Sequence, residues 1–406
     1  MRFQGLAKYL PEFGWEPVFL TPRLPGTPDE RFRVIQTEYP ENVIWWFKKK
    51  FGLNQDKRIQ EHLGIPAAVR ESKKSFSNRV ETFLRGVILY PNKRRGWCPH
   101  GIRAGTELMR NEKIDAIISS SPPEITHITA KELKRRFNVP WVADFRDLWT
   151  QFHNYRYGPM RKWFEKKLER RTLCEADALV AVSEPWAKKL ERMQPDKKTF
   201  VIPNGFDPEN AEPSALTKEF TVTYTGRVYH GKQDPRPFFE ALAELIDDGL
   251  IDRERVKVRF FGRYQYFLDN DIERYHLQGV ATQEGMVPPE EAVQRQRESQ
   301  VVLLLDWNDP DEEGVYPAKV FEYLAAKRPI LAVGGGEGVI HDLITETKAG
   351  VHAVDKKTLK QTLKQYYDEY ISTGESKYRG MEEEVSKHNQ VSMSRKYSDV
   401  LNSVIR

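Results

Sequence analysis

Short apolar runs alternate with helical patterns along the first half of the chain. Runs that suit buried strands occur at 17–21, 114–118, 140–145, 178–182 and 200–202. Apolar residues at helical spacing occur at 3–10, before residue 137 and at about 160–174. Because strands that alternate with helices favour a parallel sheet covered by helices, the first half predicts an α/β domain.

The same alternation restarts after the Pro-Asn-Gly turn at 203–205. Strands are expected at 220–224, 256–261, 301–305 and 329–333, with helices around 237–245, at 319–326 and near Ile340. We therefore expect two Rossmann-like, doubly wound parallel-sheet domains over 1–205 and 206–385, facing a central cleft, with a helical tail at 386–406 that can return to the first domain. Ligands of open α/β sheets bind beyond the carboxyl ends of the strands, so the cleft is the expected site.

The first predicted helix, at 3–10, has no apolar strand before it. A doubly wound sheet is expected to begin with a strand and a glycine-rich turn, which brings backbone amides against phosphate. Two interpretations stay open. Either the start of the sequence is truncated or misassigned, or the protein lacks one phosphate-facing loop.

Composition narrows the class of protein. Hydrophobic residues make up 39% and charged residues 30% of the chain, as in ordinary globular proteins. No apolar run approaches the roughly 18 residues of a membrane span, and the N-terminus lacks the pattern of a signal peptide. Two cysteines, Cys98 and Cys174, give neither a disulfide framework nor metal-ligand spacing. We expect a cytoplasmic protein.

A basic insertion over about 45–100 changes this picture. The net charge is only +5, yet residues 45–100 hold thirteen Lys and Arg against four Asp and Glu. Aromatic residues interrupt the cations, as in Trp45, Trp46 and Phe47 before three lysines. Such a surface suits peripheral contact with an anionic membrane, on the inner face of the cell membrane. Nucleic acid or plain solvent would suit the same charges.

The most informative motif runs from Gly314 through Val315 and Tyr316 to Lys319 and Glu322. A loop here leads into a predicted helix, whose first amides can hold phosphate. The carboxylate of Glu322, one turn inside the helix, can accept hydrogen bonds from ribose hydroxyl groups. The motif therefore suits a nucleoside diphosphate.

A second motif follows the predicted strand at 220–224. A short glycine-containing turn separates Gly226 and Arg227 from Lys232. Two cations at this spacing can reach one diphosphate and stabilise the charge that develops as it leaves.

Together the two motifs resemble the donor-binding signature of the GT-B glycosyltransferases of family 4, the glycosyl transferases group 1. The family has a Glu-x7-Glu pattern, in which the second glutamate holds the ribose and corresponds to Glu322. The first glutamate, which contacts the sugar, falls at Gly314, and Lys319 is the charged residue that can replace it. The resemblance implies Arg227 and Lys232 as catalytic cations. It further implies donor contacts from Gly226, Gly314, Val315, Tyr316, Lys319 and Glu322, and base contacts from Met286 and Val287.

Polar residues of the first half follow predicted strands and are expected on the acceptor side. Asp144, Arg146 and Asp147 come after the strand at 140–145, where the resemblance places catalytic residues; many family members have a histidine where this chain has Arg146. A purely structural hydrogen-bonded cluster is the alternative for these three. Ser121 and His127 are expected near the acceptor, although a lone histidine is often simply packed.

The resemblance implies a retaining, metal-independent hexosyltransferase that needs no cofactor and acts in the synthesis of cell-surface polysaccharide or glycoconjugates. The acceptor would be a glycan or a lipid-linked molecule, and the departing diphosphate would help to deprotonate it. Asp309-Pro310-Asp311 has the form of a metal-binding Asp-x-Asp motif, but it has no accompanying histidine and is interpreted as a loop. Two alternatives remain, a sugar-nucleotide epimerase of the same architecture and a basic nucleic-acid-binding protein. No nucleic acid is needed for the preferred function.

Overall fold

The computed structural model describes residues 2–23, 29–38, 94–153, 155, 157–211, 214–309 and 312–405. Residues 45–93, which make up most of the basic insertion and hold its interleaved aromatic residues, lie outside the described residues. The chain divides into two compact units. The C-terminal unit comprises Met1–Phe13 and Pro203–Lys396, and the N-terminal unit comprises Gly14–Ile202 and Tyr397–Arg406.

The C-terminal unit is built on a six-stranded sheet in which all strands are parallel. The strands are β7 (Phe220–Thr225), β8 (Val256–Phe261), β9 (Ala281–Gly285), β10 (Val301–Leu305), β11 (Ile330–Val333) and β12 (Gly350–Ala353). Their order across the sheet is β12-β11-β10-β7-β8-β9, so the direction of winding reverses between β10 and β7. Such a reversal opens a crevice beyond the carboxyl ends of the two strands.

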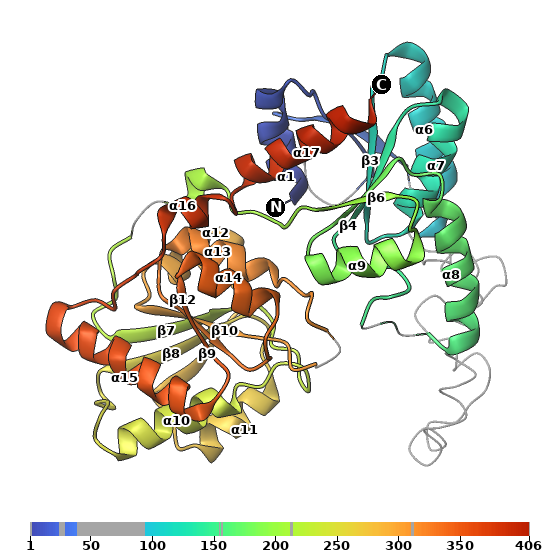
Figure 1. The fold of residues 1–406 in the computed structure, drawn as a ribbon. Coiled ribbons are helices and arrows are strands. Elements are labelled where there is room, and N and C mark those ends of the chain that lie inside the picture. The colour runs from blue at the N-terminus through green and yellow to red at the C-terminus, as the bar shows by residue number, and fades with distance from the viewer. Residues whose placement is uncertain are drawn as a thin grey trace. The chain divides into compact units, whose positions relative to one another are not determined.

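Helices cover both faces of this sheet (Figure 1). One face carries α10 (Arg236–Asp247), α11 (Tyr266–Arg274) and α15 (Lys356–Thr373), and the other carries α13 (Ala318–Ala326), α14 (Val339–Thr347) and the short α16 (Glu382–Ser386). Helix α12 (Pro289–Arg297) packs against α13 and β7. Strand β10 shows why both faces are buried: Leu303 belongs to the first core, and its neighbours Val302 and Leu304 belong to the second.

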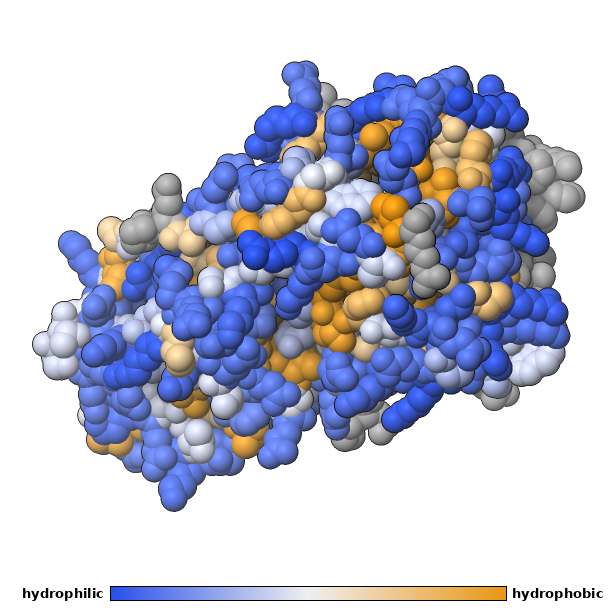
Figure 2. All heavy atoms as spheres, turned by 45° about the horizontal axis from the view of Figure 1, so that its top comes forward, coloured by the Kyte–Doolittle hydropathy of each residue, from blue (hydrophilic) through white to orange (hydrophobic). Residues whose placement is uncertain are grey.

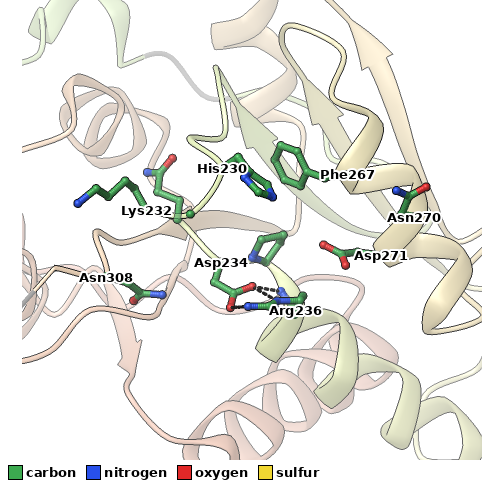
Figure 3. A pocket seen from close by; sticks show the side chains of 11 residues that line it. His230, Lys232, Asp234, Arg236, Phe267, Asn270, Asp271 and Asn308 are labelled. Carbon is green, nitrogen blue, oxygen red and sulfur yellow. Dashed lines mark hydrogen bonds and ion pairs between the residues drawn. The ribbon is translucent and has the colours of Figure 1, made fainter. Parts of the chain in front are cut away.

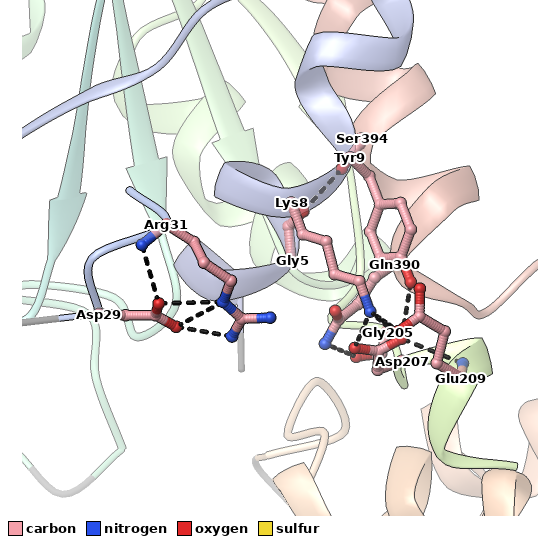
Figure 4. A network of polar contacts seen from close by, with 10 residues as sticks. All are labelled: Gly5, Lys8, Tyr9, Asp29, Arg31, Gly205, Asp207, Glu209, Gln390 and Ser394. Atoms are coloured by element: carbon pink, nitrogen blue, oxygen red, sulfur yellow. Dashed lines mark hydrogen bonds and ion pairs between the residues drawn. The ribbon is translucent and has the colours of Figure 1, made fainter. Parts of the chain in front are cut away.

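Helix α1 (Arg2–Tyr9) and the 3-10 turn η1 (Leu10–Phe13) belong to the C-terminal unit. Figure 4 shows how polar contacts fix α1. Lys8 Nζ lies 2.9 Å from Asp207 Oδ2, and the Tyr9 hydroxyl donates to Asp207 Oδ1 over 2.6 Å. Ser394, in α17 (Gln390–Val404), donates to the carbonyl of Gly5 over 3.4 Å. These contacts join α1 to the chain just after residue 203 and to the start of α17.

The N-terminal unit contains a four-stranded parallel sheet in the order β3-β4-β5-β6 and a separate parallel pair, β1 with β2. The strands are β1 (Val18–Pro22), β2 (Arg33–Thr37), β3 (Ile117–Ser121), β4 (Trp141–Phe145), β5 (Ala178–Ala181) and β6 (Lys198–Val201). The helices are α6 (Cys98–Asn111), α7 (Ile125–Phe137), α8 (Pro159–Leu173) and α9 (Glu184–Met193). Short 3-10 turns lie at η2 (Arg95–Trp97) and, in the C-terminal unit, η3 (Pro208–Asn210).

The predicted α/β class with two parallel sheets is confirmed, and among the predicted strands β3 differs most from its predicted bounds. Strand β3 does not span 114–118 but begins at Ile117 and continues through the three serines to Ser121. Ser120 pairs with Asp144 of β4, and its hydroxyl donates to Asp144 Oδ2 over 2.6 Å, so side-chain hydrogen bonding keeps these polar residues in the sheet.

Charged and polar residues dominate the face of the molecule drawn in Figure 2, in keeping with the charged content of 30%. Among the described residues, none of the helices combines the length and the apolar character that crossing a bilayer requires.

Candidate functional site

The candidate site lies at the carboxyl ends of β7 and β10, where the sheet of the C-terminal unit changes its direction of winding. The loop after β10 is joined to the loop after β7 because the backbone N–H of Asn308 donates to the carbonyl of Lys232 over 2.8 Å. Gly226, the first residue after β7, donates to the carbonyl of Phe261 at the end of β8 over 2.7 Å. Three strand ends therefore meet in one small region.

Two glycines allow the loops after β7 and β8 to approach each other. Gly226 has a φ of +103°, which side-chain-bearing residues rarely adopt. A Cβ atom on Gly262 would lie 2.2 Å from the carbonyl oxygen of Gly226, a distance that no packing adjustment of a side chain relieves. Positions 226 and 262 therefore require glycine. Because Gly226 has no side chain, a ligand can approach its backbone closely.

The loop that carries the two predicted cations is held in place by Gln233, which is buried. Its side-chain Nε2 donates to the carbonyl of Leu305 over 2.7 Å, and its Oε1 accepts from the backbone N–H of Tyr229 over 3.1 Å. The Tyr224 hydroxyl adds a bond to the carbonyl of Arg227 over 2.9 Å. Sequence reasoning did not single out Gln233, because a neutral amide next to Lys232 carries no recognisable pattern.

The two predicted cations lie on this loop in different environments. Arg227 is exposed, and its guanidinium carbon lies 5.1 Å from the centre of the Tyr229 ring. Lys232 Nζ lies 2.7 Å from Asp309 Oδ2, in an ion pair that links the loops after β7 and β10. Asp309 thus has an ion-pair partner on the loop after β7. A diphosphate would compete with Asp309 for Lys232.

A pocket of about 510 Å³ opens beside Lys232 (Figure 3). It is lined by residues 230–236 of the loop after β7, by Phe267, Asn270 and Asp271 of α11, and by Asn308. Asp234 and Arg236 face each other through two hydrogen bonds of 2.8 and 2.6 Å at the start of α10. The ring centres of His230 and Phe267 lie 4.7 Å apart, and both rings line the pocket. The pocket therefore opens beside the loop that carries Lys232.

Lys319, in the first turn of α13, points its amine toward β7. Nζ lies 3.7 Å from the centre of the Tyr224 ring. The amine is also close to Gly226, because a Cβ atom added to that glycine would lie 3.3 Å from Nζ. The amine is buried and has no hydrogen-bond partner among the described residues, although part of the side chain is exposed. Burial lowers the pKa of Lys319 to about 7, and the negative charge of Glu322 opposes this shift.

Glu322, the predicted ribose contact, is half-buried and held by a neighbouring helix. Gln296 of α12 donates through Nε2 to Glu322 Oε2 over 3.0 Å and to Thr225 Oγ1 over 2.9 Å. The hydroxyl of Tyr323 accepts from the backbone N–H of Thr225 over 3.1 Å. The carboxylate is thus tied to the end of β7. Gln296 was also missed from the sequence, because only the fold brings α12 against α13.

One of the remaining donor-side residues lines a second pocket of about 320 Å³. Val315 lines it, whereas Gly314 is buried and its N–H donates to Glu312 Oε1 over 3.3 Å. Tyr316 packs on Phe321, with ring centres 5.6 Å apart. The other lining residues are Asp306, Trp307, Asp309, Glu312, Glu313 and 336–340.

Met286 and Val287, the predicted base contacts, follow the end of β9. Met286 is 79% exposed and Val287 is half-buried, so both side chains are within reach of a ligand at the end of the sheet. No group of three or more His, Cys, Asp or Glu side chains is arranged to hold a metal ion in the part of the chain that the structure describes.

Two of the predicted residues of the N-terminal unit are fully buried. Asp144 accepts from Ser120 over 2.6 Å and, through its other oxygen, from the hydroxyl of Tyr397 over 2.6 Å. His127 shares a 2.7 Å hydrogen bond with Ser119, and its ring centre lies 4.7 Å from that of Phe145. Burial lowers the pKa of His127 to about 3, so the ring is neutral. Both side chains are fully buried in the unit, and their predicted catalytic and acceptor-side roles stay predictions.

Arg146, Asp147 and Ser121 gather at the carboxyl ends of β3 and β4. Arg146 Nη2 donates to the carbonyl of Pro122 over 2.7 Å, and the Ser121 hydroxyl donates to the carbonyl of Asp147 over 3.2 Å. Burial raises the pKa of Asp147 to about 6, against the lowering effect of Arg146. The Asp147 carboxyl group is therefore the titratable group of this cluster that can change charge near neutral pH.

Comparison with known proteins identifies a matching family and several similar structures. The model of the family described as Glycosyltransferase Family 4 matches residues 2–210. Sucrose-phosphate synthase from Thermosynechococcus elongatus is similar in structure, with a TM-score of 0.60 and 14% identity over 99% of this chain and 92% of that chain. Anabaena HepE, solved with UDP and glucose, gives a TM-score of 0.59 and 12% identity over 95% of this chain and 99% of that one.

A third similar structure is an S. aureus TarM variant solved with Fondaparinux, alpha-GlcNAc-glycerol and UDP. Its TM-score is 0.54 and its identity 13%, over 77% of this chain and 59% of that chain. No curated protein sequence matches the chain. At these identities the structural likeness establishes the fold, two Rossmann-like units of the GT-B type.

Proposed function

The chain belongs to glycosyltransferase family 4, and we propose that it transfers a hexosyl group from a nucleoside-diphosphate sugar to an acceptor hydroxyl group. The observation that carries this proposal is the meeting of Arg227, Lys232, Lys319 and Glu322 at the switch point of the C-terminal sheet. Three cations and one fixed carboxylate suit a diphosphate joined to a ribose.

In the proposed donor complex, Glu322 accepts hydrogen bonds from the ribose hydroxyl groups. Gln296 already orients this carboxylate, so little ordering of Glu322 is needed when the donor binds. The diphosphate lies against Gly226, where the backbone is bare, and contacts Arg227 and Lys232. Met286 and Val287 lie at the end of β9 and are proposed to contact the base.

The proposed reaction retains the configuration of the donor sugar. The acceptor hydroxyl oxygen forms a bond to the anomeric carbon, and the bond from that carbon to the diphosphate oxygen breaks on the same face. The diphosphate leaves with the bonding electrons, and one of its oxygens takes the acceptor proton. Arg227, Lys232, Lys319 and the first amides of α13 neutralise the added charge, so the scheme uses no metal ion.

Uridine diphosphate is the first nucleotide to test. Anabaena HepE and S. aureus TarM were both solved with UDP, and their fold is the fold of this chain. The base-side loop of this chain offers Met286, exposed enough to pack against any base. UDP-sugars therefore come before GDP- and ADP-sugars in the proposed order of testing.

For the acceptor side we propose a glycan or a lipid-linked molecule of cell-surface polysaccharide or glycoconjugate synthesis, reached in the cytoplasm. Arg146, Asp147 and Ser121 are proposed to meet it, because they lie together at strand ends. The basic composition of 45–100 supports peripheral contact with an anionic membrane.

The test is release or transfer of sugar from UDP-, GDP- and ADP-glucose by the wild type and by Lys232→Ala. We expect turnover with one donor and a loss of roughly 10²-fold or more in kcat for the variant. Lys356→Ala is the matched control, since Lys356 forms an exposed ion pair with Glu240 in the same unit. Absence of turnover with every donor, or equal turnover by Lys232→Ala, would contradict the proposal. Conversion of the donor to an epimer without any acceptor would favour an epimerase.

A further inference from the structure

Helix α8 of the N-terminal unit turns its acidic side chains inward and its large apolar side chains outward. Glu165 and Glu169 are 2% and 0% exposed, whereas Met160, Trp163 and Phe164 are 61%, 59% and 51% exposed. A surface helix of a globular protein normally shows the opposite arrangement. The outer surface of α8 therefore requires an explanation that packing among the described residues of the unit does not supply.

The inward carboxyl groups form hydrogen bonds inside the unit, although Glu169 Oε1 has no partner among the described residues. Glu165 Oε1 lies 2.6 Å from Arg161 Nε, and its other oxygen accepts from the Tyr155 hydroxyl over 2.8 Å. Glu169 accepts from the backbone N–H of Thr150 over 3.2 Å. Burying these groups leaves no carboxylate on the outer surface of α8.

The outer surface of α8 consequently carries one sign of charge. All exposed charged residues of the helix are cations, namely Lys162, Lys166, Lys167, Arg170 and Arg171. They surround the apolar side chains, and Lys167 Nζ lies 5.4 Å from the centre of the Trp163 ring. Trp163 and Phe164 pack edge to face, with ring centres 4.8 Å apart. We define Met160, Trp163 and Phe164 with these five cations as the α8 patch.

We propose that the α8 patch is a docking surface for an anionic lipid bilayer. Tryptophan favours the boundary between headgroups and acyl chains, and phenylalanine and methionine can insert beside it. The cations attract anionic headgroups, and no exposed carboxylate of the helix repels them. A folded protein partner would need a patch both acidic and apolar, whereas an anionic bilayer supplies both properties everywhere on its surface.

This inference gives the proposed membrane contact a location on described residues, and it does not depend on the donor chemistry. It predicts that α8 keeps the protein at the surface on which a lipid-linked acceptor would be presented. Its test uses no nucleotide, so its failure would leave the proposed glycosyltransferase reaction in place.

The experiment is co-sedimentation of the full chain with phosphatidylcholine vesicles, with and without about 30% phosphatidylglycerol. Two triple variants are compared with the wild type, Met160→Ser/Trp163→Ser/Phe164→Ser and Lys162→Gln/Lys166→Gln/Lys167→Gln. We expect each to lower the partition coefficient on anionic vesicles by about tenfold or more, and high salt to weaken wild-type binding.

Matched controls are available in the C-terminal unit. Lys356→Gln/Lys360→Gln/Lys364→Gln removes the same number of lysine charges, and Tyr264→Ser/Tyr266→Ser removes exposed aromatic rings. Both should bind vesicles within about twofold of the wild type. If the α8 variants bind as the wild type does, or if they change only the oligomeric state measured by sedimentation velocity, the bilayer proposal is wrong.

Discussion

The amine of Lys319 lies 3.7 Å from the centre of the Tyr224 ring and has no hydrogen-bond partner among the described residues. The ring face attracts a cation, but burial favours the neutral amine and lowers its pKa to about 7. The Glu322 carboxylate of its own helix opposes this shift. The phenols Tyr224 and Tyr323 keep their protons, because burial raises the pKa of both. A bound diphosphate would therefore raise the pKa of Lys319.

Donor binding should accordingly take up a proton above neutral pH. Below pH 7 the amine is already charged, so the Kd is independent of pH; above pH 7 it rises by up to about tenfold per pH unit, until the pKa of the complex is reached. Calorimetric titration with UDP-glucose from pH 6 to 9 measures this, because a sugar-bound diphosphate, unlike UDP, has no phosphate group that titrates near pH 6.

Lys319→Met should remove this pH dependence. Lys327→Met is the control, because Lys327 ends the same helix in an exposed ion pair with Glu382. A wild-type Kd that stays constant up to pH 9 would show that Lys319 does not sense the donor.

Gln296→Ala should raise the donor KM by about tenfold, because Glu322 loses the amide that orients it. Loss of a buried hydrogen-bonding side chain also lowers the free energy of unfolding by roughly 1–3 kcal/mol. Gln300→Ala separates the two effects. Gln300 is equally buried, but its side chain bonds to Gly374 and Ser376. The Gln300→Ala variant should be less stable than the wild type but have the same donor KM. A similar rise in donor KM in both variants would contradict the role of Gln296.

Gly262→Ala should disrupt the donor site and lower the free energy of unfolding by about 2 kcal/mol or more, because its Cβ would meet the carbonyl of Gly226. Urea unfolding of Gly158→Ala provides the comparison. Gly158 has a φ of −67° and no atom within 4 Å of the added methyl group, so its change should stay within about 0.5 kcal/mol. Equal stability of the two variants would refute the tight crossing of the loops.

Glu169→Gln should stabilise the protein at pH 8 and do little at pH 4.5. Burial raises the pKa of Glu169 from 4.5 to about 7, so the folded state favours the protonated carboxyl group. Its contribution to stability is therefore complete below pH 4.5 and is lost as the pH rises toward 7. Glutamine avoids this loss, which amounts to roughly 3 kcal/mol at pH 8.

Urea unfolding of the wild type and Glu169→Gln at the two pH values measures the difference. Exposed Glu132, replaced by Gln, serves as the control because its ion pair with Arg136 lies at the surface. A stabilisation by Glu169→Gln that is the same at both pH values would rule out ionisation as its cause.

The strands that the sequence predicts well are the central ones. Strands β8 and β10 have the predicted bounds, because their long apolar runs are buried on both faces of the sheet. Strands β9 and β12 were not predicted, and they are the two edges of the sheet. Strand β9 alternates buried and exposed positions and includes Thr282, Gln283 and Glu284, so a search for apolar runs passes over it.

The charged residues of the site could be found from the sequence, but their supports could not. Arg227, Lys232 and Glu322 belong to motifs whose spacing suits a diphosphate and a ribose. Gln233 and Gln296 act through hydrogen bonds to residues far away in the sequence, and nothing local distinguishes a bracing glutamine from a surface one. For His127 the pattern left two alternatives, and the sequence did not predict that its side chain is completely buried.

The most direct test of the donor site is a thermal-shift titration with UDP, GDP and ADP on the wild type, Glu322→Ala and Arg227→Ala. One nucleoside diphosphate should stabilise the wild type by about 2.7 kcal/mol at 100 times its Kd, and both variants should lose most of that shift. If no nucleoside diphosphate raises the melting temperature, or if both variants shift as much as the wild type, the donor does not bind at the ends of β7 and β10.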